Sequence, residues 1–282
     1  YVIGDFVWTA LDYLGEAGIG KVYVDEKLSF AAAYPYHFAN CGDFDICGFK
    51  RPQSYYRDIL WGVREAPYIA VLPPALHGKK IAFSPWGWEP VIESWTFPGW
   101  EGKPVTVDVY SAADEVALLV NGVSAGRKPA GAAQQNKASF EVPYEPGTIV
   151  AVGYTNGTET GRYEIVTAEA PSALRLTVDR AVLTPASGDL AYVTVEVVDA
   201  EGVRVTNADP EVSFEVAGPG QLIAVGAPDP MSEALYTGDR RGAFEGRLMA
   251  VVRSTGEPGE ITLRATAAGL STASITVEVP EG

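Results

Sequence analysis

The first eight residues, YVIGDFVW, form an apolar run that only Gly4 and Asp5 interrupt. A run of this kind predicts a strand that is buried on both faces, as the strands of parallel sheets are. The backbone groups of such a strand need hydrogen-bonding partners on both sides, and no other segment of this sequence is an obvious partner. The chain also lacks an initiator methionine, because its first methionine is Met231. We therefore expect the chain to be the C-terminal piece of a larger protein.

Residues 1–64 predict a strand, a long loop and a helix, in that order. The segment SFAAAYPYHFANCGDFD is rich in aromatic and turn residues, which favours an ordered loop. Pro52 suits the first turn of a helix, and apolar residues recur at helical spacing through SYYRDILWGV. A strand followed by a helix is one βα unit of a TIM barrel. Residues 65–90 carry five prolines, so we expect an extended linker rather than a helix or a central strand.

Two modules of short, alternating strands follow, over residues 91–168 and 169–282. In the first module, VTVDVYS alternates clearly, and Asn121-Gly122 predicts a tight hairpin turn because both central positions of such a turn need positive φ. The second module has seven such segments, from LRLTVDR to ASITVEV. A turn about every ten residues is typical of a β-sandwich. We therefore predict a mainly β chain, with two immunoglobulin-like β-sandwiches after the last βα unit of a barrel.

The composition excludes some partners. A formal net charge of −15 disfavours binding to nucleic acid, whose phosphates would be repelled. No apolar run approaches the roughly 18 residues of a membrane helix, so we expect no membrane partner. Cys41 and Cys47 are the two cysteines of the chain, and they are open to three interpretations: buried thiols, a disulfide or a weak metal pair. Two cysteines without a nearby pair of histidines are too few for a zinc site, and we expect neither a metal nor a cofactor.

Several long blocks resemble glycoside hydrolase family 2, in particular its β-galactosidase group. The last barrel strand and its loop are similar to GDFVWTALDYLGE. The approach to the last barrel helix is similar to CGDFDICGFKRPQSYYRDILW. WTFPGWEGKPVTVDVYSAADEVALLVNGVSAGR resembles the immunoglobulin-like domain that follows the barrel in a bacterial branch. LAYVTVEVVDAEGVRV and VSFEVAGPGQLIAVG resemble a further module of the same kind.

This resemblance implies a retaining exo-glycosidase that hydrolyses terminal β-glycosidic bonds. Such an enzyme needs two carboxylates about 5–5.5 Å apart, and in the family both lie on barrel strands upstream of this sequence. None of the 36 acidic residues matches either motif, so we expect no catalytic residue here and an inactive chain. The expected partners are a carbohydrate substrate, through the parent barrel, and the N-terminal catalytic region. The alternative is a non-catalytic carbohydrate-binding or adhesive β-sandwich protein. This alternative would be favoured if the first strand joined a sandwich.

The resemblance also implies the substrate-binding residues. Trp8 ends the expected barrel strand, where its ring would form the floor of the sugar pocket and stack on the apolar face of a pyranose; a purely structural core position is the other interpretation. Asp12 and Glu16 follow in the loop, and either could hydrogen-bond a sugar hydroxyl or a neighbouring barrel loop. Tyr13 is equally ambiguous.

Charged residues in the loop before the helix suggest a structural role. We expect Lys50 and Arg51 to order this loop through ion pairs with Asp43 or Asp45. Some family members bind sodium in this region, but Cys47 stands where an Asn is expected, which argues against such a site here.

Four tryptophans fall within fifteen residues: Trp86, Trp88, Trp95 and Trp100. An exposed row of rings would suit stacking on a polysaccharide, whereas buried rings would fix the first sandwich to the barrel. We favour the packed arrangement, because the resemblance of WTFPGWEG supports it and because the prolines between the rings favour an extended path across a surface.

Overall fold

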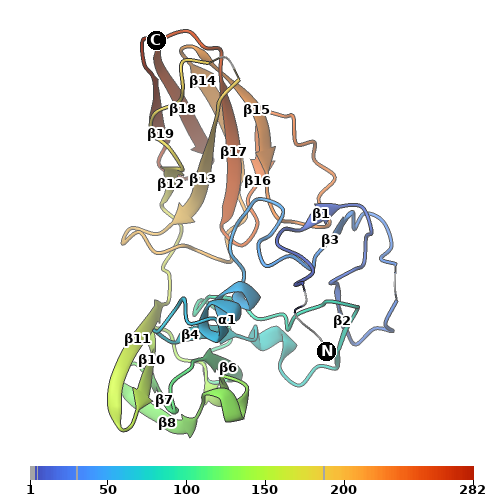
Figure 1. The fold of residues 1–282 in the computed structure, drawn as a ribbon, viewed down its shortest axis with the longest axis vertical. Helices are drawn as coiled ribbons and strands as arrows, with labels where there is room; N and C mark the ends of the chain where they lie inside the picture. Colours follow the sequence, from blue (N-terminus) through green and yellow to red (C-terminus); the bar gives the residue numbers. More distant parts are fainter. Residues whose placement is uncertain (1–3, 5, 30, 187) are drawn as a thin grey trace. The chain divides into compact units, whose positions relative to one another are not determined.

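The computed structural model describes residues 4, 6–29, 31–186 and 188–282. The chain divides into two compact units, Tyr1–Thr167 and Ala168–Gly282, and Figure 1 shows that strands dominate both. The predicted mainly β fold with two β-sandwiches is confirmed.

The first sandwich packs two antiparallel sheets against each other. One sheet has the order β4-β6-β9 and the other β11-β10-β7-β8. Their strands are β4 (Tyr68–Val71), β6 (Pro104–Tyr110), β7 (Glu115–Val120), β8 (Val123–Pro129), β9 (Lys137–Pro143), β10 (Thr148–Thr155) and β11 (Thr158–Val166). In β7, every second residue is buried, namely Val116, Leu118 and Val120. This alternation gives each sheet one apolar face, and the two faces form the core of the sandwich.

The predicted hairpin at Asn121-Gly122 is present between β7 and β8. Asn121 has φ 50° and Gly122 has φ 78°, and both values lie in the left-handed region that a tight two-residue hairpin turn requires. A second Asn-Gly pair at Asn156 and Gly157 (φ 51° and 78°) turns β10 into β11 in the same way.

The segment expected to be a linker contributes one strand to the first sandwich and another to the N-terminal part of the first unit. Tyr68–Val71, which is buried at all four positions, pairs with β6 as an edge strand. Further on, β5 (Ile81–Phe83) pairs with β2 (Val22–Val24). The prolines of this segment lie outside both strands. Each strand therefore keeps all its backbone N–H donors for pairing.

The second unit is a sandwich of its own. Its sheets have the orders β12-β13-β17-β15 and β16-β14-β18-β19. All seven expected strands are present, together with the short strand β16 (Arg240–Gly242). The seven are β12 (Ala173–Val178), β13 (Leu190–Val198), β14 (Glu211–Ala217), β15 (Gly220–Gly226), β17 (Arg247–Ser254), β18 (Gly259–Ala267) and β19 (Ala273–Val279). Valine, leucine and alanine side chains fill the core between the two sheets.

The N-terminal part of the first unit contains the predicted helix, α1 (Pro52–Leu60), with Pro52 in its first turn. Ile59 of α1 packs against Tyr68 and Tyr110 of the first sandwich, as expected for an amphipathic helix. The helix ends at Leu60, however, and Trp61 and Val63, which are part of the predicted pattern, are 65% and 73% exposed. Two short strands, β1 (Tyr13–Leu14) and β3 (Phe38–Ala39), pair in the long loop.

The strand expected over residues 2–8 lies partly outside the described residues. Its described positions, Gly4 and Phe6 to Trp8, have no regular secondary structure, and they join neither sandwich. Phe6 is 99% exposed and Trp8 is 53% exposed. The described part of the chain therefore does not supply the partners that a buried parallel strand needs.

Three of the four clustered tryptophans are packed, as expected. Trp95 is fully buried in the core of the first sandwich, where its indole donates to the carbonyl of Glu145 at 2.9 Å. Trp100 is partly buried against the same core, and Trp88 against the cluster around Ile59. Trp86 differs, because it is 59% exposed. The four rings therefore do not form a single exposed row.

Replacing Trp95 by Ala should leave a cavity in the first sandwich. We expect the free energy of unfolding to fall by about 3–5 kcal/mol, the usual cost of truncating a buried large aromatic side chain, as measured by chemical denaturation. The matched control is Trp86→Asn, because Trp86 is exposed and has φ 59°, which Asn adopts readily. This control should change stability by less than about 0.5 kcal/mol. Equal effects of the two substitutions would contradict the packed role of Trp95.

Candidate functional site

The candidate site is the loop that follows Trp8 and the segment that lies beside it. Residues 9–12 run parallel to residues 41–44 and exchange backbone hydrogen bonds with them: Asp12 donates to Phe44, Phe44 to Ala10, and Asp43 to Thr9, at 2.9–3.0 Å. Because two polar loops satisfy each other's backbone groups, the segment after Trp8 is ordered without a sheet around it. The Trp8–Thr9 peptide bond is cis.

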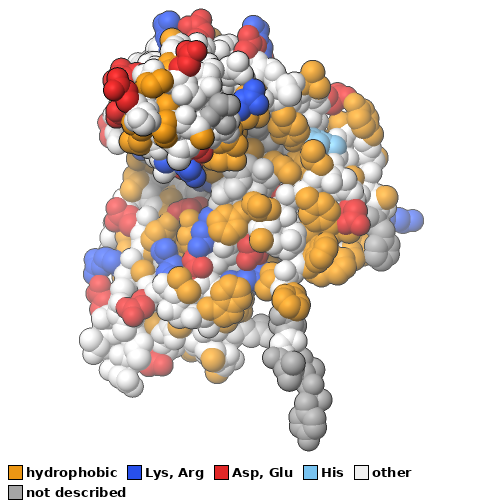
Figure 2. Space-filling model, turned by 45° about the horizontal axis from the view of Figure 1, so that its top comes forward, with side chains coloured by type: hydrophobic (Ala, Val, Ile, Leu, Met, Phe, Trp, Pro, Cys, Tyr) orange, Lys and Arg blue, Asp and Glu red, His pale blue; other side chains and the backbone are white. Residues whose placement is uncertain are grey.

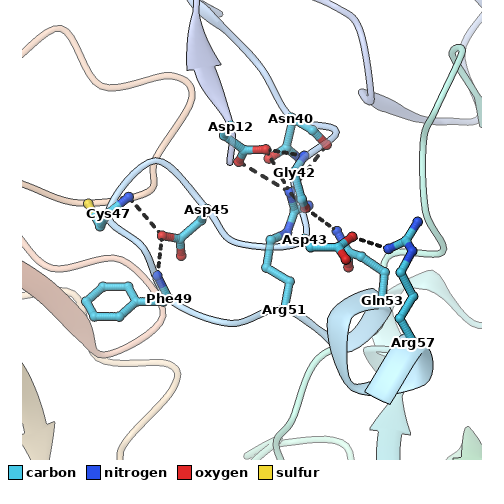
Figure 3. A network of polar contacts seen from close by, with 10 residues as sticks. All are labelled: Asp12, Asn40, Gly42, Asp43, Asp45, Cys47, Phe49, Arg51, Gln53 and Arg57. Carbon is cyan, nitrogen blue, oxygen red and sulfur yellow. Dashed lines mark hydrogen bonds and ion pairs between the residues drawn. The ribbon is translucent and has the colours of Figure 1, made fainter. Parts of the chain in front are cut away.

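The Asp12 carboxylate is the centre of the polar network in Figure 3. Its side chain is fully enclosed, and it accepts a hydrogen bond from the Gly42 amide at 2.7 Å. The Nη1 atom of Arg51 lies 3.1 and 3.2 Å from the two carboxylate oxygens, and it also donates to the Asn40 and Gly42 carbonyls. Asp12 therefore fastens its own loop to the neighbouring one.

Gly42 permits this close approach. A Cβ atom at position 42 would lie 2.3 Å from the Asp12 amide nitrogen and 2.4 Å from the Phe44 carbonyl oxygen. Both neighbours are backbone atoms, so any side chain here would force the two loops apart. Gln53 of α1 fixes the same point by donating to the Gly42 carbonyl at 2.7 Å.

Further ion pairs tie this loop to α1. Arg57 pairs with Asp43, and Lys50 pairs with Asp58. Asp45 instead accepts hydrogen bonds from the Cys47 and Phe49 amides, at 2.9 and 3.0 Å, and so closes a turn. The structural role expected for Lys50 and Arg51 is present, but with different partners: Arg51 pairs with Asp12 rather than with Asp43 or Asp45.

Burial determines the protonation of this network. Desolvation raises the pKa of Asp12 to about 6, against the opposing attraction of Arg51 and the Gly42 hydrogen bond. Burial likewise raises the pKa of Asp43, although Arg57 partly offsets the effect. The pKa of the Cys41 thiol rises to about 11 for the same reason, so this thiol stays protonated at neutral pH. Among the described residues, neither Cys41 nor Cys47 is in a disulfide.

A second group of residues in this loop faces outward. The half-exposed Trp8 ring meets the edge of the Tyr13 ring, with centroids 6.3 Å apart and planes at 90°. The Tyr13 hydroxyl donates to the Glu16 carboxylate, and that hydrogen bond raises the pKa of Tyr13. Trp8, Tyr13 and Glu16 thus form a small accessible group, which we call the Trp8 group. Figure 2 shows hydrophobic side chains open to solvent at several places on the face drawn.

The structure therefore separates the two predicted substrate-binding residues. Trp8 lies in the accessible group, whereas the Asp12 carboxylate is enclosed and bound to Arg51. Sugar binding by either residue stays a prediction. Asp43 is paired with Arg57, and Asp45 accepts hydrogen bonds from two backbone amides, so these carboxylates near Asp12 order the loop. Sequence reasoning missed the pairing of Asp12 with Arg51, because 39 positions separate the two and no local pattern links them.

Among the residues that the structure describes, no three or more His, Cys, Asp or Glu side chains are grouped so that they could hold a metal ion. Within the same ranges, no helix has the length and apolar character needed to cross a membrane.

Comparisons with known proteins match both sandwiches. Residues 174–276 match the model of the glycoside hydrolase family 2 C-terminal domain 5, and residues 102–161 match a domain of unknown function, DUF4982. The chain is 30% identical to the β-galactosidase BoGH2A of Bacteroides ovatus, over 100% of this chain and 29% of that protein. It is also 30% identical to a putative β-glucuronidase of Formosa agariphila, over 91% of this chain and 22% of that protein.

A solved structure extends this similarity to three dimensions. The chain superposes on a glycosyl hydrolase family 2 member from Bacteroides cellulosilyticus with a TM-score of 0.90 and 38% identity. The superposition covers 99% of this chain and 36% of that one. The chain thus spans about a third, or less, of the length of these relatives.

The raised pKa of Asp12 makes a testable prediction. An NMR titration of its carboxyl carbon should show a midpoint near pH 6. Arg51→Met should move the midpoint higher, because it removes the charge that favours ionisation, whereas Arg57→Met, which removes the partner of Asp43, should move it far less. Because the folded chain holds this proton more tightly than the unfolded chain, the free energy of unfolding should fall by about 3 kcal/mol as pH rises from about 3 to about 7. A midpoint at or below pH 4 would contradict the assignment.

Proposed function

Because the chain belongs to glycoside hydrolase family 2, whose C-terminal region it carries, we propose that it is part of a retaining exo-glycosidase of the β-galactosidase type. In this proposal the parent protein hydrolyses terminal β-glycosidic bonds. This chain supplies a tryptophan at the floor of the sugar pocket and two accessory sandwiches, and the catalytic carboxylates come from outside it.

The observation that carries the proposal is the extent of the match. Nearly the whole chain superposes on one continuous family 2 architecture, at 38% identity and a TM-score of 0.90. Two named relatives with similar sequences are a β-galactosidase and a putative β-glucuronidase. The alternative, a stand-alone adhesive or carbohydrate-binding protein, is less well supported, because described residues 6–8 join neither sandwich sheet.

The geometry of the Trp8 group fits a role in substrate binding. An indole ring offers a flat apolar face to the axial C–H groups of a pyranose, and the ring of Trp8 is half-exposed. Beside it, the Tyr13 hydroxyl and the Glu16 carboxylate can exchange hydrogen bonds with sugar hydroxyls. Behind it, the network of Asp12 and Arg51 holds the loop in place, so that the ring is positioned before the sugar arrives.

The two catalytic steps need groups that this loop does not offer. A retaining glycosidase uses one carboxylate as nucleophile and a second, about 5–5.5 Å away, as acid and then base. Asp12 is enclosed by Arg51 and Gly42, and Asp43 is paired with Arg57. In our proposal, these carboxylates therefore order the loop rather than attack the sugar.

An activity assay tests the division of roles. The 282-residue chain alone should release no nitrophenol from nitrophenyl β-galactoside above a buffer blank, whereas the longer parent protein should turn it over. Turnover by the chain alone that persists through repeated purification would contradict the proposal. Faster turnover of the β-glucuronide than of the β-galactoside by the parent protein would contradict the proposed sugar.

A substitution in the parent protein tests the role of Trp8. Trp8→Ala should lower kcat/KM by about 5- to 150-fold, equivalent to about 1–3 kcal/mol, because it removes the stacking surface. Trp86→Asn is the control, since Trp86 is an exposed ring outside the Trp8 group, and it should leave kcat/KM unchanged. If Trp8→Ala folds normally and retains full kcat/KM, its ring does not contact the substrate.

A further inference from the structure

The first unit contains a pocket of about 260 Å³ that is distinct from the Trp8 group. Its walls come from α1, from the loop around Trp88, from β6 and β9, and from the short helix η2 (Ala132–Gln134). Figure 1 shows α1 lying beside β4 and β6 in this unit. Four of the lining residues belong to the segment that matches the domain of unknown function: Tyr110, Gln134, Gln135 and Lys137.

Three aromatic rings form a rigid apolar corner of this pocket. The Tyr56 ring lies 5.4 Å from the Trp88 ring and 5.2 Å from the Tyr110 ring, between centroids. Tyr56 also donates from its hydroxyl to the Gln135 carbonyl at 2.8 Å, which connects α1 to the η2 loop. Tyr110 is fully buried and Trp88 half-buried, so the rings are fixed before any ligand binds.

Polar groups face the aromatic corner from the other walls. Gln134 and Gln135 line the pocket, and both side chains are exposed. Lys137 lies 2.9 and 3.0 Å from the oxygens of Glu89, and 3.1 Å from Asp108. Of these three charged residues, Glu89 and Lys137 line the pocket and Asp108 does not, so the charges of the lining residues balance.

We propose that this pocket binds one neutral pyranose unit. A sugar has an apolar C–H face, which suits the rings of Tyr56 and Trp88, and a rim of hydroxyls, which suits side-chain amides and a carboxylate. The volume is slightly below the usual range of about 300–1,000 Å³ for small-molecule sites, so it suits a single ring rather than a longer chain. Because Lys137 is paired with Glu89, the lining offers no unpaired cation to the carboxylate of a uronate, so a neutral sugar fits better.

This site would give the first sandwich a carbohydrate-binding role of its own. It uses none of the residues of the Trp8 group and requires no catalytic carboxylate. It therefore goes beyond the proposed hydrolase function, and either proposal can fail while the other stands.

Titration of the whole chain with methyl β-D-galactopyranoside, followed in amide and indole NMR spectra, tests the inference. The Trp88 indole signal and the amides of residues 134–137 should shift together, with a Kd of about 1–10 mM, the range set by so few ligand atoms. The Trp86 indole signal should not move. Methyl β-D-glucuronide should bind several-fold more weakly, and cyclohexylmethanol, which lacks the ring of hydroxyls, should not bind. Shifts confined to the Trp8 indole would overturn the inference.

Two variants separate binding from folding. Trp88→Ala should abolish the shifts, but it also removes packing around Ile59. Gln134→Ala changes an exposed side chain, so it should fold normally and weaken binding by about 2- to 10-fold, the usual effect of one lost hydrogen bond. Trp86→Asn should bind as the parent chain does. Unchanged affinity in a folded Gln134→Ala variant, or equal binding of cyclohexylmethanol, would overturn the inference.

Discussion

The burial of Trp95 is the constraint on which the first unit depends. Its ring fills the centre of the sandwich between Phe97 and Tyr144, and its indole nitrogen donates to Glu145. Its carbonyl accepts a hydrogen bond from the Thr167 hydroxyl at 2.5 Å. Trp95 therefore connects the irregular segment before β6 to residues that closely follow β9 and β11. A buried indole contributes several kcal/mol to the free energy of unfolding. This segment can therefore be ordered although it has no regular secondary structure.

A layer of aromatic rings packs α1 against the first sandwich. Tyr55 stacks on Tyr68 at 4.2 Å, and Tyr68 stacks on Tyr163 at 5.6 Å, between centroids. The Arg64 guanidinium lies 4.6 Å from the Tyr163 ring centroid. Such offset contacts have preferred geometries, so they fix the orientation of α1 as well as its distance. The pocket that we propose to bind a sugar lies on the continuation of this layer, at Tyr56, which explains how a small surface site can be rigid.

The loop after Trp8 is ordered by a different kind of interaction. Asp12 and Arg51 are ionic groups removed from water, and the raised pKa of Asp12 indicates that desolvation exceeds the attraction between them. A buried pair of this kind adds little net stability, but it tolerates few alternative arrangements. The close contact at Gly42 restricts the loop further. Together they hold the segment that presents the Trp8 ring, which is what our proposal of a sugar-stacking role for Trp8 requires.

The sequence by itself determined the features that depend on neighbouring residues. Alternation predicted the strands of both sandwiches, Asn121-Gly122 predicted a hairpin, and Pro52 predicted the start of α1, because each signal lies within a few positions of its effect. The resemblance of long blocks predicted the family. Tertiary structure alone decided that Tyr68–Val71 becomes an edge strand, that Asp12 binds Arg51, and that Tyr56, Trp88 and Gln134 meet at one pocket. These contacts join residues that lie far apart in the chain, and only the packing of the sheets and α1 brings them within reach.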